Sequence, residues 1–249
     1  MNNIKPILSS GPMVRALSDG RKTQTRRVLK PQPPDGHRFV GIYGPGLTAV
    51  FEPLSRGDDY TVRLPYMPGD LLWVRERWSD ELLAPGEVYY YATALEDGLR
   101  ADEVAEIRWK PSIHMPRWAS RLTLEVTAVK VERLQEISQE DARAEGVATE
   151  EWDDWRENVT SIAMPEGSYI ENERDLFRDL WDGLYAKPKP IYSEGRIVSY
   201  VSYPWDGESR VETYRGLPHE IRPNPFVIAT TFVVHQQNVD QLLAARKAA

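Results

Sequence analysis

The sequence has no cysteine and no long apolar run. With zero cysteines among 249 residues, disulfides and thiolate chemistry are excluded, and a reducing compartment is favoured. No apolar run approaches the roughly 20 residues that span a bilayer, and the N-terminal ten residues lack the apolar segment of a secretory signal. We therefore expect a cytoplasmic protein without a membrane partner.

The sequence also offers few groups that could hold a metal or a cofactor. Its four histidines, His37, His114, His219 and His235, are scattered, and no two of them have the spacing of metal ligands. There is no phosphate-binding glycine loop of the nucleotide-triphosphatase type and no dinucleotide fingerprint. We therefore expect neither a metal nor a cofactor. Only His114, in PSIHMPRW, lies among other candidate binding residues; a hydrogen-bonded structural histidine is the alternative.

What the sequence does contain is a basic segment within an acidic chain. The net charge is −7, yet the run from Gly20 to Lys30 carries +5 and no acid. Its first part, GRKTQTRR, is expected to be a loop after the preceding helix, and it interleaves four cations with two threonines. A local basic site on an acidic protein favours a small or single-stranded anionic ligand over a long duplex.

The basic segment has two interpretations. In the first it is a solvated face whose cations interact with the C-terminal end of the preceding helix, and its threonines favour a strand. In the second it is an anion pocket in which Lys22 activates Thr25 as a nucleophile. A lysine that titrates near 10.4 must then be depressed towards about 7–8, and Arg21, Arg26 and Arg27 supply the like charge for this.

Periodicity predicts an α+β protein with many strands and few helices, consistent with a small, mostly antiparallel barrel that carries insertions. We expect helices at 11–20, 138–146, 171–187 and 238–249. We expect strands on both sides of a Gly-Pro-Gly turn in 37–53, the clearest strand at 121–134, and a hairpin in 196–216 that turns at Asp206-Gly207. The strand 224–235 is expected to pair inside the same barrel as 121–134.

Several of these features together resemble the ASCH domain family. Its pattern Gly-x-Lys-Thr-x-Thr-x-Arg matches Gly20, Lys22, Thr23, Thr25 and Arg27, and it is followed by the Gly-Asp turn of PGDLLWVRE and a helix ending in EDARAEG. The family fold is a small PUA-like β-barrel. The resemblance implies one domain over 1–249, with flanking helices and a core at about 1–30, 65–146 and 224–235. Large insertions would occupy about 31–64 and 147–223.

The wider arrangement resembles the larger ASCH proteins of phage and prophage genomes, and the motif resembles the bacterial N4-acetylcytidine amidohydrolases. That resemblance implies the catalytic residues Lys22, Thr25 and Glu145, with Glu140 as an alternative to Glu145. Thr25 would attack the carbonyl, Lys22 would transfer protons and Glu145 would orient Lys22. The expected function is an amidohydrolase for linear amides, with an N4-acylated cytosine base or nucleoside as substrate.

Two alternatives stay open. One is a nucleic-acid-binding module without chemistry, in which tryptophans such as Trp78, Trp109 and Trp118 either stack on unpaired bases or simply pack. The other is a ribonuclease, as reported for some relatives. The expected partner is a modified nucleoside or RNA, and the sequence does not indicate an oligomeric state. The residues expected to bind substrate or nucleic acid are Arg21, Thr23, Arg26, Arg27, His114, Arg117 and Arg121.

Overall fold

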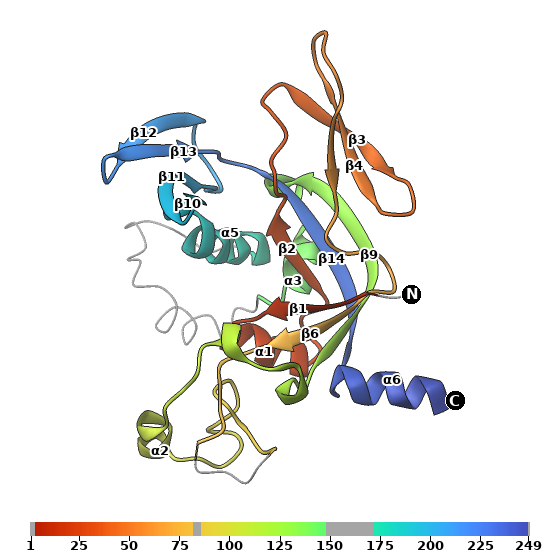
Figure 1. The fold of residues 1–249 in the computed structure, drawn as a ribbon, viewed down its shortest axis with the longest axis vertical. Coiled ribbons are helices and arrows are strands. Elements are labelled where there is room, and N and C mark those ends of the chain that lie inside the picture. The colour runs from red at the N-terminus through yellow and green to blue at the C-terminus, as the bar shows by residue number, and fades with distance from the viewer. Residues whose placement is uncertain (1–2, 82–85, 148–171, 249) are drawn as a thin grey trace. The chain divides into compact units, whose positions relative to one another are not determined.

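A computed structural model describes residues 3–81, 86–147 and 172–248 (Figure 1). It divides into two compact units. Unit 1 contains Met1–Gln24, Tyr66–Val129 and Thr230–Ala249; unit 2 contains Thr25–Pro65 and Lys130–Ala229. Each unit is described by itself. No helix in the described ranges is long and apolar enough to cross a bilayer.

The first half of the chain is mostly strands. In order, the elements are β1 (Ile4–Leu8), α1 (Gly11–Ser18), β2 (Gln24–Val28), β3 (His37–Tyr43), β4 (Thr48–Pro53), β5 (Tyr60–Arg63), β6 (Leu71–Arg75), β7 (Trp78–Ser79), β8 (Tyr89–Tyr90), α2 (Ala101–Glu106) and the 3₁₀ turns η1 (Ser112–His114) and η2 (Arg117–Ala119).

The second half begins with the longest described strand. The elements are β9 (Thr123–Arg133), the 3₁₀ turn η3 (Leu134–Glu136), α3 (Gln139–Ala144), α5 (Glu173–Tyr185), β10 (Lys189–Ser193), β11 (Arg196–Ser202), β12 (Arg210–Tyr214), β13 (Leu217–Ile221), β14 (Phe226–His235) and α6 (Val239–Ala248).

The described strands form four sheets, with the orders β1-β6-β9-β14-β2, β10-β11-β13-β12, β3-β4-β5 and β7-β8. The mixed α+β class is therefore confirmed, and β14 and β9, which lie within the ranges 224–235 and 121–134, are neighbours in one sheet. The hairpin in 37–53 is confirmed as the antiparallel pair β3 and β4. The largest sheet has an open order with β1 and β2 at its edges, and the PUA-like barrel stays a prediction.

In unit 1 a buried aspartate fixes the beginning of β6. Asp70 follows Gly69, whose φ of +90° suits a residue without a Cβ. Its Oδ1 accepts a hydrogen bond from the Asn3 backbone N–H at 3.0 Å, and its Oδ2 accepts one from Met67 at 3.2 Å. These bonds hold the chain before β1 beside the turn before β6, and the two strands pair in parallel. The Gly-Asp turn of the motif thus has a structural role.

In unit 2 the expected amphipathic helix is confirmed as α5. The Asn172 side chain accepts hydrogen bonds from the first turn, as an N-cap residue does. Leu176, Phe177, Leu180 and Trp181 are buried, and the Trp181 indole N–H donates to the Tyr203 carbonyl at 2.8 Å. The helix therefore contributes a continuous apolar stripe to the core of unit 2.

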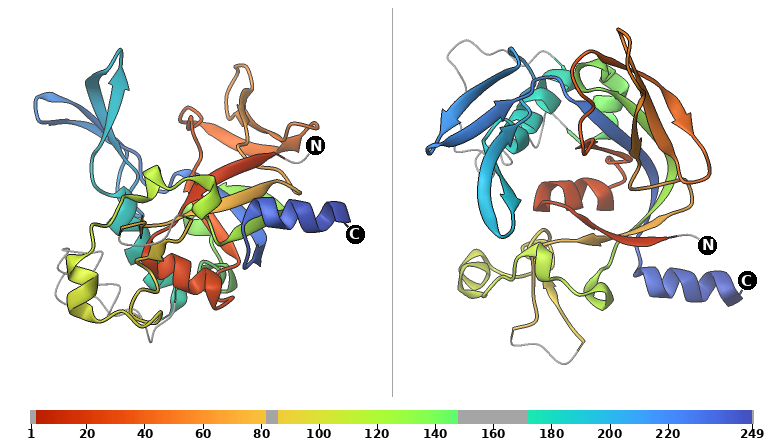
Figure 2. Two further views of the ribbon diagram at one scale, coloured as in Figure 1. Left: turned by 60° about the horizontal axis from the view of Figure 1, so that its bottom comes forward. Right: turned by 45° about the horizontal axis from the view of Figure 1, so that its top comes forward.

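The hairpin expected across Asp206-Gly207 is wrong. β11 pairs with β10 and β13, whereas β12 pairs with β13, so β11 and β12 are not neighbours. Figure 2 shows the two actual hairpins, β10-β11 in cyan and β12-β13 in blue. The reason lies in the turns: Glu194-Gly195 and Arg215-Gly216 both have positive φ at both residues, as two-residue hairpin turns require. These dipeptides, and not Asp206-Gly207, set the register.

Helix α3 was predicted correctly, while the basic segment differs from the loop that was expected. The Ser138 hydroxyl accepts a hydrogen bond from the Asp141 N–H at 3.0 Å, and Gly146 ends the helix with a φ of +83°. The basic segment, by contrast, becomes strand β2 at Gln24, because its backbone pairs with β14 in the largest sheet.

Glu173 joins α5 to α3. Its Oε1 accepts hydrogen bonds from Nε and Nη2 of Arg143 at 3.0 and 2.6 Å, and its Oε2 accepts one from Gln139 at 2.7 Å. These bonds, that of Arg143 first, lower the pKa of Glu173 from 4.5 to about 2. The ionised form is therefore preferred in the folded state.

We expect Glu173→Gln to lower the free energy of unfolding at pH 7, because the amide keeps the shape of the side chain and loses its charge. The folded pKa lies below the unfolded value of 4.5, so this contribution is complete above that pH and is lost as the pH falls towards 2. Urea unfolding between pH 7 and pH 3 measures it, with the exposed Glu208→Gln as control. A difference from wild type that stays constant with pH would contradict the assignment.

Candidate functional site

One arginine of the basic segment lies buried among carboxylates in unit 2. The Arg26 side chain has an exposed fraction of 0%. Its Nε and Nη2 donate to Oε1 of Glu132 at 3.0 and 2.7 Å, its Nη2 donates to Asp141 at 2.6 Å, and its Nη1 donates to Glu145 at 3.2 Å. We call Arg26, Glu132, Asp141 and Glu145 the Arg26 cluster.

Local sequence explains why two of these carboxylates face the same arginine. Asp141 lies in the first turn of α3, and Glu145 is its C-cap residue. Residues four apart lie on the same face of a helix. The N-cap Ser138 and the terminating Gly146 therefore determine where both carboxylates stand, and Glu132 approaches from the end of β9.

A second cation lies beside the cluster. The Lys130 ammonium lies 2.5 Å from Oε2 of Glu132, an ion pair without hydrogen-bond geometry. Withdrawing such groups from water costs several kcal/mol per ion before pairing offsets it. The guanidinium also lies 6.0 Å from the centre of the Phe177 ring, so α5 packs against the cluster.

All three predicted catalytic residues are buried. The exposed fractions are 5% for Lys22, 7% for Thr25 and 3% for Glu145, whereas Thr23 and Glu140 are exposed. Glu145 is therefore the better candidate of the two acids. The solvated-face interpretation fits Thr23 but does not fit the buried residues of the segment.

The three residues belong to different parts of the chain. Lys22 lies in unit 1, and its backbone N–H donates to the Ala16 carbonyl at 2.9 Å. Thr25 lies in unit 2 on β2, next to Arg26. Neighbouring strand residues point to opposite faces, so the Thr25 and Arg26 side chains leave β2 on opposite sides. A catalytic set of Lys22, Thr25 and Glu145 stays a prediction.

Arg27, predicted to bind an anion, lies in a cationic neighbourhood of unit 2. Partial desolvation of the otherwise exposed Lys189 side chain, together with the positive charges of Lys30 and Arg27, lowers the pKa of Lys189. The Lys189 ammonium lies 4.3 Å from the Tyr185 ring centre.

The remaining predicted binding residues all lie in unit 1, and three of them meet carboxylates. Arg21 pairs with Asp19 at 2.9 Å, and Arg117 pairs with Asp240 of α6. The Arg121 guanidinium forms two hydrogen bonds with Glu76, at 2.9 and 3.0 Å. Glu76 is 1% exposed, and burial raises its pKa even though Arg121 opposes the shift. These arginines therefore have structural partners.

The aromatic residues of unit 1 that could stack on a base differ in how accessible their side chains are. Trp78 is 4% exposed and packs edge-on against Trp118, which is 52% exposed. Trp109 and His114 line a cavity of about 520 Å³. Trp78 is thus a packing residue, whereas Trp109, Trp118 and His114 are accessible.

Sequence reasoning missed Glu132 and Asp141. Strand alternation does not mark Glu132, because the even-numbered face of β9 is buried at Leu124 and Val126 but exposed at Ala128 and Lys130. No signal marks Asp141 either, because the first turn of a helix commonly holds acids.

No group of three or more histidine, aspartate or glutamate side chains in the described ranges is arranged to hold a metal ion. In the Arg26 cluster the guanidinium occupies the space between the carboxylates. Comparisons with protein-family models, with curated proteins and with solved structures found no match.

We expect Arg26→Met to lower the free energy of unfolding by about 3–5 kcal/mol at pH 7, because it leaves buried carboxylates without their cation.

Urea unfolding at pH 7 measures the effect. The control is Arg222→Met, which breaks an exposed pair with Glu220 and should cost no more than about 1 kcal/mol. Equal, small losses for both variants would show that the cluster does not stabilise the fold.

Proposed function

We propose that this chain is an amidohydrolase of the ASCH type that removes the acyl group from an N4-acylated cytosine base or nucleoside, with Thr25 as nucleophile. The burial of Lys22, Thr25 and Glu145, beside the exposed Thr23 and Glu140, carries the proposal. Buried polar groups cost free energy, and proteins bear that cost chiefly where structure or chemistry requires the group. The PUA-like barrel belongs to the same proposal.

In the first half of the reaction the Thr25 hydroxyl attacks the acyl carbonyl. The neutral amine of Lys22 takes the hydroxyl proton as the bond between Thr25 Oγ and the carbonyl carbon forms. The tetrahedral oxyanion then collapses, the carbon–N4 bond breaks, and the Lys22 ammonium returns its proton to N4. The products are a free cytosine amine and an acyl ester on Thr25.

In the second half water replaces the cytosine. Lys22 takes a proton from the water as its oxygen attacks the ester carbonyl, and it returns the proton to Thr25 Oγ as the ester bond breaks. The carboxylic acid leaves, and the threonine is restored. Both halves pass through an oxyanion, which a nearby cation such as Arg27 or a backbone N–H would stabilise.

Glu145 acts in this mechanism as a positioning residue. Its Oε1 accepts a hydrogen bond from Arg26 at 3.2 Å, and Arg26 is itself held by Glu132 and Asp141. A carboxylate fixed in this way can orient a lysine without being displaced by it. Arg26, expected at first to bind substrate, thereby has a supporting role.

We expect Thr25→Val to lower the hydrolysis rate at least about 100-fold, because the nucleophile is lost, and Thr25→Ser to retain activity. The substrates are N4-acetylcytosine, N4-acetylcytidine and a short RNA with one N4-acetylcytidine, followed by chromatography of the deacetylated product. Thr213→Val is the control, since Thr213 is an exposed threonine on β12 of the same unit, and it should have little effect.

The outcomes separate the candidate functions. Full activity in a folded Thr25→Val variant would exclude the threonine mechanism. Cleavage of the RNA chain without deacetylation would favour the ribonuclease, and RNA binding without any product would favour the module without chemistry.

A matched pair of variants tests whether Glu145 is the carboxylate that acts on Lys22. We expect Glu145→Gln to lower the maximal rate and to shift the rising limb of the pH–rate profile to lower pH, because a carboxylate beside a lysine stabilises its ammonium form. Glu140→Gln, an exposed change in the same helix, should leave the profile unchanged. A lower rate with an unshifted profile would mean that Glu145 does not act on the base.

A further inference from the structure

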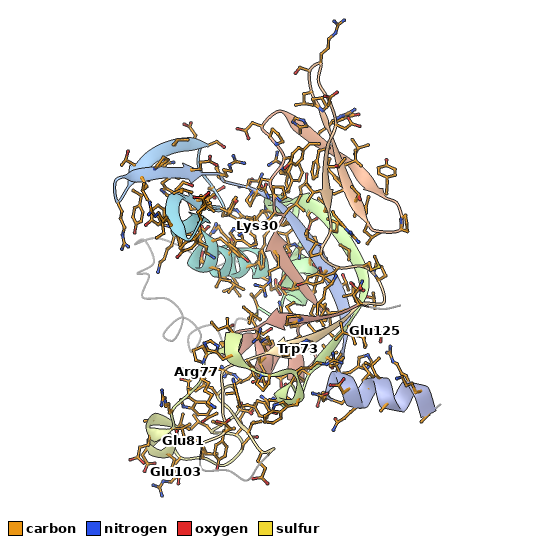
Figure 3. The ribbon with its side chains drawn as sticks, viewed as in Figure 1. Lys30, Trp73, Arg77, Glu81, Glu103 and Glu125 are labelled. Atoms are coloured by element: carbon orange, nitrogen blue, oxygen red, sulfur yellow. The ribbon has the colours of Figure 1, made fainter. Side chains whose placement is uncertain are left out.

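The cavity of about 520 Å³ in unit 1 has no role in the proposed hydrolysis. It lies where the chain around β7 meets the segment after α2. Figure 3 labels Arg77 and Glu81 in the same loop-rich part of unit 1 as Glu103 of α2. The residues that line it are the acids Asp80 and Glu81, the cations Arg108 and Lys110, the aromatic residues Trp109 and His114, and Pro111.

Hydrogen bonds fix the two walls of the cavity to each other. The Lys110 backbone N–H donates to the Trp78 carbonyl at 2.7 Å, and the Trp78 backbone N–H donates to the Lys110 carbonyl at 3.3 Å. The Ser79 hydroxyl donates to the Arg108 carbonyl at 3.2 Å, and the Arg108 N–H donates to Glu81 Oε2 at 2.8 Å. The cavity is thus preformed, which reduces the entropy cost of binding.

Trp109 presents a fixed aromatic surface. Its indole N–H donates to the Val104 carbonyl at 2.8 Å, so that donor is already used inside unit 1. Tyr91 packs edge-on against it at 5.1 Å and 83°, and the Arg77 guanidinium lies 4.3 Å from the Tyr91 ring centre. A ring held in this way suits stacking rather than hydrogen bonding.

The charged side chains that line the cavity differ in whether they already have a hydrogen-bond or ion-pair partner. Lys110 pairs with Asp80 at 2.5 Å, and Glu81 accepts the Arg108 backbone N–H. The Arg108 guanidinium, by contrast, has no hydrogen bond or ion pair with any residue in the described ranges, and neither does the His114 ring. A planar cation and an imidazole thus remain next to a stacking surface. A guanidinium binds phosphate oxygens in a two-pronged geometry.

We propose that this cavity binds one unpaired nucleotide, with its base stacked on Trp109 and its phosphate on Arg108. The volume lies within the usual range for small-ligand sites. Base faces are inaccessible inside a duplex, so a stacking site selects free or single-stranded nucleotides. A spare oxygen of Glu81 can accept an exocyclic amine of the base. The proposal is independent of Thr25 and of hydrolysis.

The test measures binding of each nucleoside monophosphate by calorimetry, and of a fluorescein-labelled single-stranded RNA of ten nucleotides by anisotropy. We expect Arg108→Ala to weaken binding about 10-fold or more and to reduce the salt dependence of RNA binding by about one phosphate contact. Trp109→Leu should weaken binding about 10-fold with an unchanged salt dependence, and Trp109→Phe should restore most of it.

The control is Lys247→Ala, which removes the same charge from exposed α6 and should bind as wild type does. Equal affinity for monophosphates and RNA would identify a free nucleotide as the ligand, and binding of RNA alone would identify a single strand; both support the site. Absence of binding to every probe would overturn the proposal. So would unchanged binding in folded Arg108→Ala and Trp109→Leu variants, or full competition by duplex RNA.

Discussion

The guanidinium of Arg26 brings carboxylates from two separate parts of unit 2 within hydrogen-bonding distance of one group. Glu132 comes from the end of β9, while Asp141 and Glu145 come from α3 and its C-cap. Without this cation the three carboxylates would repel one another in a medium of low dielectric. The arginine thus determines that β2, β9 and α3 can pack together. Glu173 then joins α3 to α5, so the ion pairs continue from the sheet to the second helix.

This arrangement explains why cations and threonines alternate in the basic segment. A strand directs successive side chains to opposite faces, so Arg26 can face the buried carboxylates while Thr25 faces the other side of β2. Arg26 then supports the fold, and in the proposed function Thr25 is the nucleophile. Because Arg26 also holds Glu145, changes in the cluster are expected to alter stability and the position of that carboxylate together.

Local signals in the sequence were sufficient to predict some helices and strands but not others. Ser138 and Gly146 delimit α3, and the apolar spacing of Leu176, Phe177 and Leu180 identifies α5, because helix signals lie within a few residues. The hairpin at Asp206-Gly207 was wrong because several X-Gly dipeptides compete, and only the strand order decides among them. The partners of Arg26 are 106, 115 and 119 residues away in the chain, and no local pattern encodes such pairs.

The long separation between ion-pair partners along the chain also explains a limit of sequence motifs. A motif identifies cations, but it does not show which of them can bind a ligand. Arg117 and Arg121 stand beside candidate aromatic residues in the sequence, yet Asp240 and Glu76, 123 and 45 residues away, hold them in the fold. In a chain with 38 acidic and 31 basic residues, an arginine generally finds a carboxylate once the chain folds. Arg108 is therefore informative: no carboxylate in the described ranges pairs with its guanidinium, and Trp109 next to it lines the same cavity. An arginine that an acidic protein leaves without a carboxylate beside a fixed aromatic ring is better explained by a ligand than by stability, because its guanidinium forms no ion pair within the described ranges.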